Sequence, residues 1–500
     1  MVIIVNKYER MWAHFFLSAC SHVEVVLFFA KYILSSLNTM NFSNFRLIFF
    51  LYLLHIPSFM YSLVTTLNFD VVVYGATPSG IAAAVVASNN TNLKVALLEP
   101  TSYISGMAGP GGIGLRDIFC SQTVLFEDSV IHTWLHMNDV DYNETSSPIW
   151  QPDQRIGQKN WYTLVTNPKY NIYLATNTGL LEQDGSVIMV NTNIQSIATI
   201  NTLTEDPTNI TIYTAKIFID ASYEGDIMVA ANLSYTYGRE AHDVYNESLA
   251  GVQPFTSFSQ FQVPVNPYYS NGSLLFGVDE SIPPVGTGDD RVMPYSYRLC
   301  VMPVSSGNTV PWPQPVNYNA EDFEVLIRYT IGLNNHSSKG PSLGDIVSTL
   351  PYNGYPSNKE HPLRYDLCES GGSAVSSDEP SSIYTAYITG NRTVRKQVSE
   401  QVKYWVMGMM YTLANHPRVP EVTRNSTSAW GLCADAWPNN NNWPELMYVR
   451  EATRLIGDFV ATQNNLVKGI CVPNSIGLGA WTIGKYSIHI KYIILIKVYS

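Results

Sequence analysis

Residues 70–99 constrain the fold of this chain more than any other segment. They begin with Val-Val-Val-Tyr at 71–74, a short apolar run rich in β-branched residues that is typical of a strand buried on both faces. Gly75 then allows a sharp turn, and Pro78 suits the first position of a helix because its missing N–H would have no partner there. The small apolar residues at 81–87 let that helix pack closely on a sheet. The segment therefore predicts a strand, a turn and a helix in succession.

A second apolar strand is expected at residues 94–98, and it ends in Glu99, 19 residues after Gly80. In a dinucleotide-binding βαβ unit an acid at this place reaches a ribose hydroxyl, while the N-terminus of the helix faces the pyrophosphate. Thr77 occupies the position of the usual second glycine and can cap the helix. We therefore predict a dinucleotide site here. The alternative is an ordinary βαβ unit that binds no ligand.

Composition narrows the class of protein. Five hundred residues exceed what one compact core usually holds, so we expect two closely associated domains. A hydrophobic content of 46% with only 14% charged residues fits a large core. The net charge of -11, without a basic stripe, argues against nucleic acid as a partner. No cysteines are spaced as CxxC, so we expect no iron–sulfur cluster, no zinc site and no other metal.

Residues 40–62 have the pattern of a secretory signal: one basic residue, an apolar stretch and a small or polar exit. We expect cleavage near Ser62 and read residues 1–39 as an upstream extension. The competing interpretation is a signal anchor, with a membrane-spanning helix between residues 45–67 that Pro57 interrupts.

Glycosylation motifs support export. Nine Asn-x-Ser/Thr triplets without an intervening proline follow the signal-like segment. Their asparagines are Asn89, Asn143, Asn209, Asn232, Asn246, Asn271, Asn335, Asn391 and Asn425. We therefore expect N-linked glycans and a secreted, lysosomal or other luminal location. Five cysteines remain in the mature chain, which allows at most two disulfides, and their pairing is left open.

Several later segments have distinct patterns. The glycine-rich residues 105–117 form a loop whose backbone could press against a flat ligand. Residues 170–219 read as a series of strands, and the last of them runs into residues 221–226, as at a sheet edge that meets a cofactor. Residues 251–365 are rich in proline, glycine and tyrosine, and predict an irregular second region with a short helix near residues 321–328.

Helical periodicity returns late in the chain. Apolar residues recur every three or four positions over residues 394–413, which predicts a long amphipathic helix that ends before Pro417. A second helix is expected after Pro444. Its Arg450 and Arg454 would share a face that forms surface ion pairs or contacts a substrate.

Taken together, seven motifs resemble the FAD-dependent oxidoreductase family, which is distantly similar to the flavin subunit of heterodisulfide reductase. The motifs lie at residues 71–84, 106–115, 218–226, 237–240, 247–251, 297–300 and 446–452. The resemblance extends over residues 69–480. It implies FAD held without a covalent bond, and an oxidoreductase that acts on a small organic substrate. The alternatives are a degenerate or truncated flavoprotein fold that serves as a secreted binding or structural protein, and an NAD-dependent dehydrogenase.

The resemblance also implies site residues. It places Gly75, Thr77, Ser79 and Gly80 at the pyrophosphate, Glu99 at the adenosine ribose, Gly106, Met107, Gly111 and Gly112 near the central part of the flavin, and Ala221, Gly225 and Asp226 at the inner edge of the site. No catalytic residue follows from the motifs. Arg116 and Asp117, which follow the glycine loop, are the leading candidates, and Arg298 and His361 are weaker ones.

The expected fold class is α/β, a glutathione-reductase-type, FAD-binding Rossmann-like domain with an interleaved irregular α+β second region. We predict a signal and extension at 1–66, the FAD-binding core at 67–250, a substrate or cap region at 251–390, a helical region at 391–482 and an atypical tail at 483–500. Family members continue past the equivalent of Gly479 into a final strand and helix. The tail here differs, so we expect an incomplete copy of the fold that holds FAD poorly.

Overall fold

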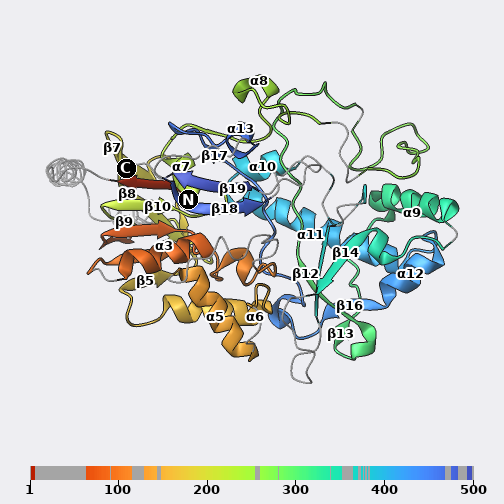
Figure 1. Ribbon diagram of the computed structural model, residues 1–500, viewed down its shortest axis with the longest axis horizontal. Coiled ribbons are helices and arrows are strands. Elements are labelled where there is room, and N and C mark those ends of the chain that lie inside the picture. Colours follow the sequence, from red (N-terminus) through yellow and green to blue (C-terminus); the bar gives the residue numbers. More distant parts are fainter. Residues whose placement is uncertain are drawn as a thin grey trace, which may run out of the picture.

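The computed structural model describes most of the chain after the signal-like segment. The described residues are 2–5, 63–89, 92–114, 129–143, 148–253, 260–279, 281–337, 339–351, 364–369, 373–375, 377, 380, 383–467, 475–481 and 492–497. Figure 1 shows two units side by side, one with helices α3, α5 and α6 along its sheet and one crossed by the long helix α11. Among the described residues, no helix combines the length and the hydropathy that crossing a membrane requires.

A five-stranded sheet forms the centre of the first unit. In spatial order its strands are β1 (Val2–Val5), β10 (Ile217–Asp220), β3 (Val71–Tyr74), β4 (Val95–Leu98) and β5 (Ile172–Ala175). Strands β10, β3, β4 and β5 run parallel, and β1 pairs antiparallel with β10. Helix α3 (Pro78–Ser88) connects β3 to β4. The predicted strand, turn, helix and second strand are therefore confirmed.

Alternate residues of β3 enter two different cores, because successive side chains of a strand point to opposite faces. Val71 and Val73 pack with α3, α5 (Val130–Tyr142) and α6 (Gln154–Val165). On this face the rings of Trp134 and Trp161 stack with centroids 5.1 Å apart, and both rings are fully buried. Val72 and Tyr74 point the other way, towards a second sheet. Burial on both faces explains the continuous apolar run of β3.

The second sheet covers the other face of the first. Its strands are β2 (Leu63–Asn68), β9 (Asn209–Thr214), β8 (Asn193–Asn201) and β6 (Thr178–Leu180), with β7 (Val187–Val190) also paired to β8. The hydroxyl of Tyr74 accepts a hydrogen bond from the Leu180 N–H at 3.0 Å, which ties the two sheets together. The strand-rich prediction for residues 170–219 is confirmed, although β8, with its many polar residues, was not foreseen.

The second unit contains an antiparallel sheet that the sequence did not reveal. Its strands, in spatial order, are β13 (Thr309–Val310), β16 (Trp430–Cys433), β12 (Leu299–Pro303), β15 (Tyr365–Glu369) and β14 (Val347–Pro351). Strand β12 lies between β15 and β16, and its register with β16 pairs Val301 with Leu432. An α+β second region was expected, but the positions and pairing of these strands were not predicted, because short strands with distant partners leave no local pattern.

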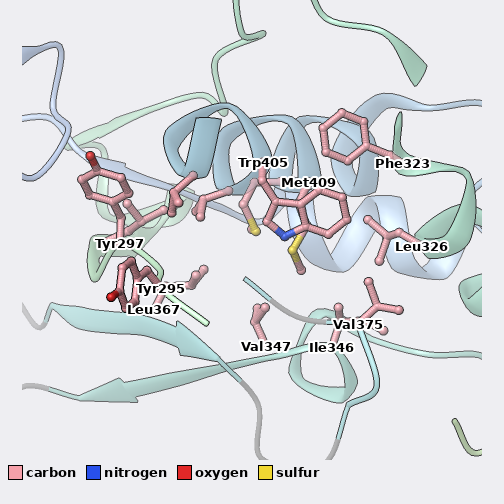
Figure 2. Close-up of a cluster of buried hydrophobic side chains, with 14 of the residues drawn as sticks. Tyr295, Tyr297, Phe323, Leu326, Ile346, Val347, Leu367, Val375, Trp405 and Met409 are labelled. Carbon is pink, nitrogen blue, oxygen red and sulfur yellow. The ribbon is translucent and has the colours of Figure 1, made fainter. Parts of the chain in front are cut away.

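Helix α11 (Arg392–Asn415) forms the spine of the second unit, and it confirms the predicted amphipathic helix. Its N-terminus is capped by Asn391, whose Oδ1 accepts a hydrogen bond from the Val394 N–H at 3.0 Å. Figure 2 shows Trp405 and Met409 of α11 within a cluster of buried side chains from several elements. The Trp405 ring stacks on Phe323, with centroids 5.2 Å apart.

The remaining elements are mostly short, apart from the 13-residue helix α9. They are η2 (Gly106–Ala108), α7 (Asp226–Ala230), β11 (Tyr235–Thr236), α8 (His242–Tyr245), η3 (Val304–Ser306), η4 (Ala320–Phe323), α9 (Glu324–His336), η5 (Leu343–Asp345), α10 (Tyr384–Thr389), α12 (Glu421–Ser428), η6 (Pro438–Asn440), β17 (Arg454–Leu455), α13 (Gln463–Val467), β18 (Ser475–Trp481) and β19 (Tyr492–Lys497). Strands β18 and β19 pair antiparallel. The helix expected near residues 321–328 is present and extends further, as η4 followed by α9.

The helix predicted after Pro444 is absent. Residues 443–453 are irregular, and β17 pairs with β11 instead. Residues distant in the sequence form hydrogen bonds with this segment. The Tyr448 N–H donates to the Ser296 carbonyl at 2.8 Å, and the Arg454 guanidinium donates to the Gly238 carbonyl at 2.7 Å. Tertiary contacts thus override the helical periodicity. Arg454 also pairs with Glu240 at 2.7 Å, so its expected ion pair is confirmed.

Candidate cofactor site

The turn between β3 and α3 needs glycine at two positions. Gly75 has a φ of +93°, and a Cβ atom added there would lie 2.6 Å from the Ser222 nitrogen. A Cβ atom added at Gly80 would collide with the carbonyl oxygen of Gly75. The start of α3 therefore lies directly against the end of β3, as in a dinucleotide-binding turn.

Thr77 holds the first turn of α3 in place. Its Oγ1 accepts a hydrogen bond from the Gly80 N–H at 3.3 Å and donates one of 2.8 Å to the Ala221 carbonyl. Ser79 is exposed, whereas Gly75, Thr77 and Gly80 are buried. The N-terminus of α3 thus opens to solvent at Ser79. Because a helix N-terminus carries partial positive charge, this opening fits a pyrophosphate.

Glu99 lies at the end of β4, next to the same turn. The side chain is 8% exposed, and its Oε2 accepts a hydrogen bond from the Ala76 N–H at 2.8 Å. Its Oε1 accepts from the Thr101 N–H at 2.9 Å and the Thr101 hydroxyl at 2.8 Å. Burial raises the pKa of Glu99 to about 7, although these hydrogen bonds by themselves lower it. The carboxyl is therefore fixed in position and titrates near neutral pH.

The glycine loop approaches both units. Gly106, Met107, Gly111 and Gly112 are all buried. A Cβ atom added at Gly112 would lie 3.1 Å from the Arg298 carbonyl and 3.2 Å from the Trp437 ring, both in the second unit. The loop therefore forms part of the contact between the two units.

Tyr223 is a site residue that the sequence reasoning passed over. Its hydroxyl accepts a hydrogen bond from the Met107 N–H at 2.9 Å, and a Cβ atom added at Gly106 would collide with that hydroxyl. The pKa of Tyr223 is raised, first by burial and then by the charges of Glu224 and Glu99. Even so, 39% of the residue's surface is exposed. Tyr223 thus joins the loop after β10 to the glycine loop while staying partly exposed.

The rest of the loop after β10 faces the second unit. Glu224 accepts a hydrogen bond from the Tyr387 hydroxyl at 2.7 Å, and Asp226 pairs with the Arg395 guanidinium at 2.7 Å. Burial and then the charge of Asp226 raise the pKa of Glu224. Of the three residues predicted at the inner edge of the site, Ala221 lies at the turn, Gly225 adopts the left-handed region at φ +74°, and Asp226 is engaged by α11.

Two arginines of the second unit flank one aromatic ring near Tyr223. The guanidinium carbons of Arg298 and Arg450 lie 5.7 Å and 5.1 Å from the centre of the Tyr448 ring. Arg298 is 3% exposed and pairs with the fully buried Asp366, with 3.1 Å between Nε and Oδ2. The weak catalytic candidate Arg298 is therefore a buried ion-pair partner in this structure.

A partly buried ion cluster also joins the two units. Arg364 lies 2.9 Å from the Oδ2 of Asp153, the N-cap of α6, and also pairs with Asp435, which follows β16. Burial alone would raise the pKa of Asp153, but the hydrogen bond from Arg155 and the charge of Arg364 hold it below its ordinary value. The cluster fixes the first turn of α6 against the second unit.

The candidates Arg116, Asp117 and His361 lie outside the described residues. Within the part of the chain that the structure describes, no group of three or more His, Cys, Asp and Glu side chains could hold a metal ion. The predicted residues that the structure does bring together are those of the β3–α3 turn, Glu99 and Ala221. This arrangement fits the adenosine and pyrophosphate part of a dinucleotide.

The family of this chain follows from its sequence as a whole. The chain matches the family described as FAD dependent oxidoreductase over residues 70–488, and it therefore belongs to that family. No curated protein matches the chain. FAD is the cofactor of this family. Bound FAD supplies the redox chemistry, and the protein supplies binding, orientation and electrostatics.

Three solved structures are distantly similar to the chain. The chain is 16% identical to L-proline dehydrogenase from P. horikoshii over 36% of this chain and 26% of that chain, with a TM-score of 0.21. For Thermovibrio ammonificans THI4 the identity is 15%, over 41% of this chain and 75% of that chain, with a TM-score of 0.25. The chain is 17% identical to 3-ketosteroid-Δ4-(5α)-dehydrogenase from Rhodococcus jostii RHA1 over 33% of this chain and 48% of that chain, with a TM-score of 0.21.

Proposed function

We propose that the chain binds FAD across the β3–α3 turn in a glutathione-reductase-type arrangement and oxidises a small organic substrate. The observation that carries this proposal is the meeting of four groups at one point: Gly75, Gly80, Thr77 and the Ala221 carbonyl. The turn follows a central strand of a parallel sheet, where dinucleotides bind at the carboxyl ends of the strands.

Each end of the cofactor has a matching surface in this proposal. The Glu99 carboxyl would accept a hydrogen bond from the ribose, and the N-terminus of α3 would face the pyrophosphate near Ser79. Tyr223 contacts the glycine loop through the Met107 N–H, where the central part of the flavin would pass. The substrate would then lie where the glycine loop meets the second unit, near Gly112 and Tyr448.

FAD titration of the purified full chain tests this proposal. The flavin absorbance should shift on binding and saturate at one FAD per chain. Gly80→Ala should lose this binding, because the added methyl group collides with the Gly75 carbonyl. Gly344→Ala is the matched control, since the nearest atom to an added Cβ there is the Ser342 hydroxyl at 3.8 Å. Equal FAD affinity in Gly80→Ala and the parent would overturn the proposed site.

We also propose that the protein acts in the secretory pathway, as a secreted or luminal enzyme. Cys300 and Cys433 form a disulfide between β12 and β16, with a Cα–Cα distance of 5.5 Å. Both cysteines are fully buried. Disulfides form and persist in oxidising compartments and are rare in the cytosol, so this pair supports the location that the signal-like segment predicts.

Expression with the native N-terminus in animal cells tests the location. We expect product in microsomes or the medium, with a new N-terminus near Ser62, which removes the edge strand β1 from the first sheet. We also expect Cys300 and Cys433 to be protected from a thiol reagent until reduction. An uncleaved product that stays in the membrane after alkaline extraction would favour the signal anchor. A cytosolic product with both thiols free would contradict the proposal.

A further inference from the structure

We propose that the folded protein carries N-linked glycans at five defined positions, and this inference depends on the luminal location proposed above. The five asparagines are Asn232, Asn246, Asn271, Asn335 and Asn391, and all five are exposed. An acceptor triplet also needs its hydroxyl residue, which the oligosaccharide transferase must reach. In these five motifs both the asparagine and the hydroxyl residue are exposed, which distinguishes them from other motifs in the same chain.

The hydroxyl residues of these five motifs are exposed as well. They are Ser234, Ser248, Ser273, Ser337 and Thr393. The five motifs lie in both units, from the end of α7 to the start of α11. Each therefore stays accessible at both ends after the chain has folded.

Two other motifs lose this access on folding. Asn425 is exposed, but its partner Thr427 is fully buried and donates a hydrogen bond to the Thr423 carbonyl at 2.8 Å within α12. Asn209 begins β9, and its partner Thr211 is half-buried within the sheet. The Asn425 site can therefore be modified only before its helix forms, whereas the Asn209 site loses part of its access when its strand forms. The motifs at Asn89 and Asn143 extend into residues outside the described ranges.

Local hydrogen bonding leaves the reactive nitrogen available at two well-defined sites. The Asn271 Oδ1 accepts hydrogen bonds from the Ser273 N–H at 3.0 Å and the Ser273 hydroxyl at 2.7 Å. The Asn391 Oδ1 caps α11 through the Val394 N–H. In both cases the fold uses the oxygen, whereas glycosylation uses Nδ2. A glycan at either site therefore leaves these hydrogen bonds intact.

The reaction is a simple group transfer. The Asn Nδ2 atom forms a bond to the anomeric carbon of a sugar, and the bond from that carbon to the diphosphate of a lipid-linked donor breaks. The diphosphate leaves with the bonding electrons, and one Nδ2 proton is released. Nothing is oxidised or reduced.

Occupancy at each site is the decisive measurement. Residues 63–500 are expressed in animal cells behind a supplied cleavable signal, which separates this test from that of the native leader. Enzymatic deglycosylation in heavy-oxygen water converts each modified Asn to a labelled Asp, which peptide mass spectrometry counts. We expect high occupancy at the five sites and lower occupancy at Asn425.

Asn391 provides a matched set of variants. Thr393→Ala and Asn391→Asp both remove the glycan but keep a capping oxygen for α11, so they should lose one glycan mass without destabilising the helix. Asn391→Ala removes glycan and cap together and should also lower the melting temperature. A translocated product with the Cys300–Cys433 disulfide formed but the five sites bare would overturn the glycan proposal and leave the proposed location standing. Occupancy as high at Asn425 as at the five sites would overturn the accessibility argument.

Discussion

The Thr77 hydroxyl donates a hydrogen bond of 2.8 Å to the carbonyl of Ala221, a residue 144 positions later in the chain. Thr77 caps α3, and Ala221 directly follows β10. The bond therefore fixes the N-terminus of α3 to the end of the neighbouring parallel strand. The helix start and the loop that carries Tyr223 are positioned as one piece.

Thr77 should be replaceable only by a residue that keeps the hydroxyl. Thr77→Val removes both the cap and the bond to Ala221, which should cost about 1–2 kcal/mol of stability and weaken FAD binding. Thr77→Ser should stay close to the parent in both respects. Denaturant unfolding and FAD titration measure the two effects. Equal stability of the Val and Ser variants would contradict the role of this hydroxyl.

A substitution at Ser79 should affect FAD binding and folding stability in opposite directions. Ser79→Asp places a negative charge in the first turn of α3, which favours the helix by about 0.3–1 kcal/mol. The same charge should repel a pyrophosphate at that end and reduce FAD affinity. Ser79→Asn is the uncharged control. We expect an unchanged or higher melting temperature with weaker FAD binding for Ser79→Asp alone, and unchanged affinity would place the phosphates elsewhere.

Glu99 should give the cofactor-free protein a distinct pH dependence. Burial raises its pKa from 4.5 to about 7, so the folded state holds the proton more tightly than the unfolded state does. The resulting stabilisation is fully present below about pH 4.5 and is lost as the pH rises to about 7. Across this window the parent should lose about 3 kcal/mol more than Glu99→Gln. Urea unfolding over the pH range measures this, and parallel curves for the two proteins would refute it.

The buried Arg298–Asp366 pair should be sensitive to the loss of one partner. Asp366→Ala leaves the buried guanidinium without this carboxylate and should cost about 3–5 kcal/mol. The exposed pair of Lys216 and Asp70, 3.3 Å apart, is the control. Lys216→Ala should change the free energy of unfolding by less than about 1 kcal/mol. Thermal melting of both variants tests this contrast. A similar loss of stability in the two variants would mean that burial of the ion pair does not determine the effect.

The sequence predicted the parts of the fold that local patterns determine. Strand β3, helix α3 and strand β4 follow from a buried apolar run, a Pro at N1 and small helix residues, all within residues 70–99. Helix α11 follows from its apolar periodicity. The close approach of Gly75 and Gly80 was predictable for the same reason, because a tight strand–helix turn requires those residues.

What the sequence left undetermined depends on pairing between distant residues. Strands β12 and β16 lie about 130 positions apart, and neither alone differs from a loop with a few apolar residues. The segment after Pro444 has helical periodicity, yet partners such as Ser296 hold it in an irregular path. The position of Tyr223 depends on a hydrogen bond to Met107, 116 residues away. No local signal marks any of these.

The disulfide between Cys300 and Cys433 has a consequence for the covalent topology of the protein. The two cysteines enclose 132 residues that include β13, β14, β15, α9 and the whole of α11. A protease that cuts once anywhere between them leaves one molecule, since the bridge still joins the two fragments. Such a nicked chain runs as a single band until a reductant is added, and only then separates into two.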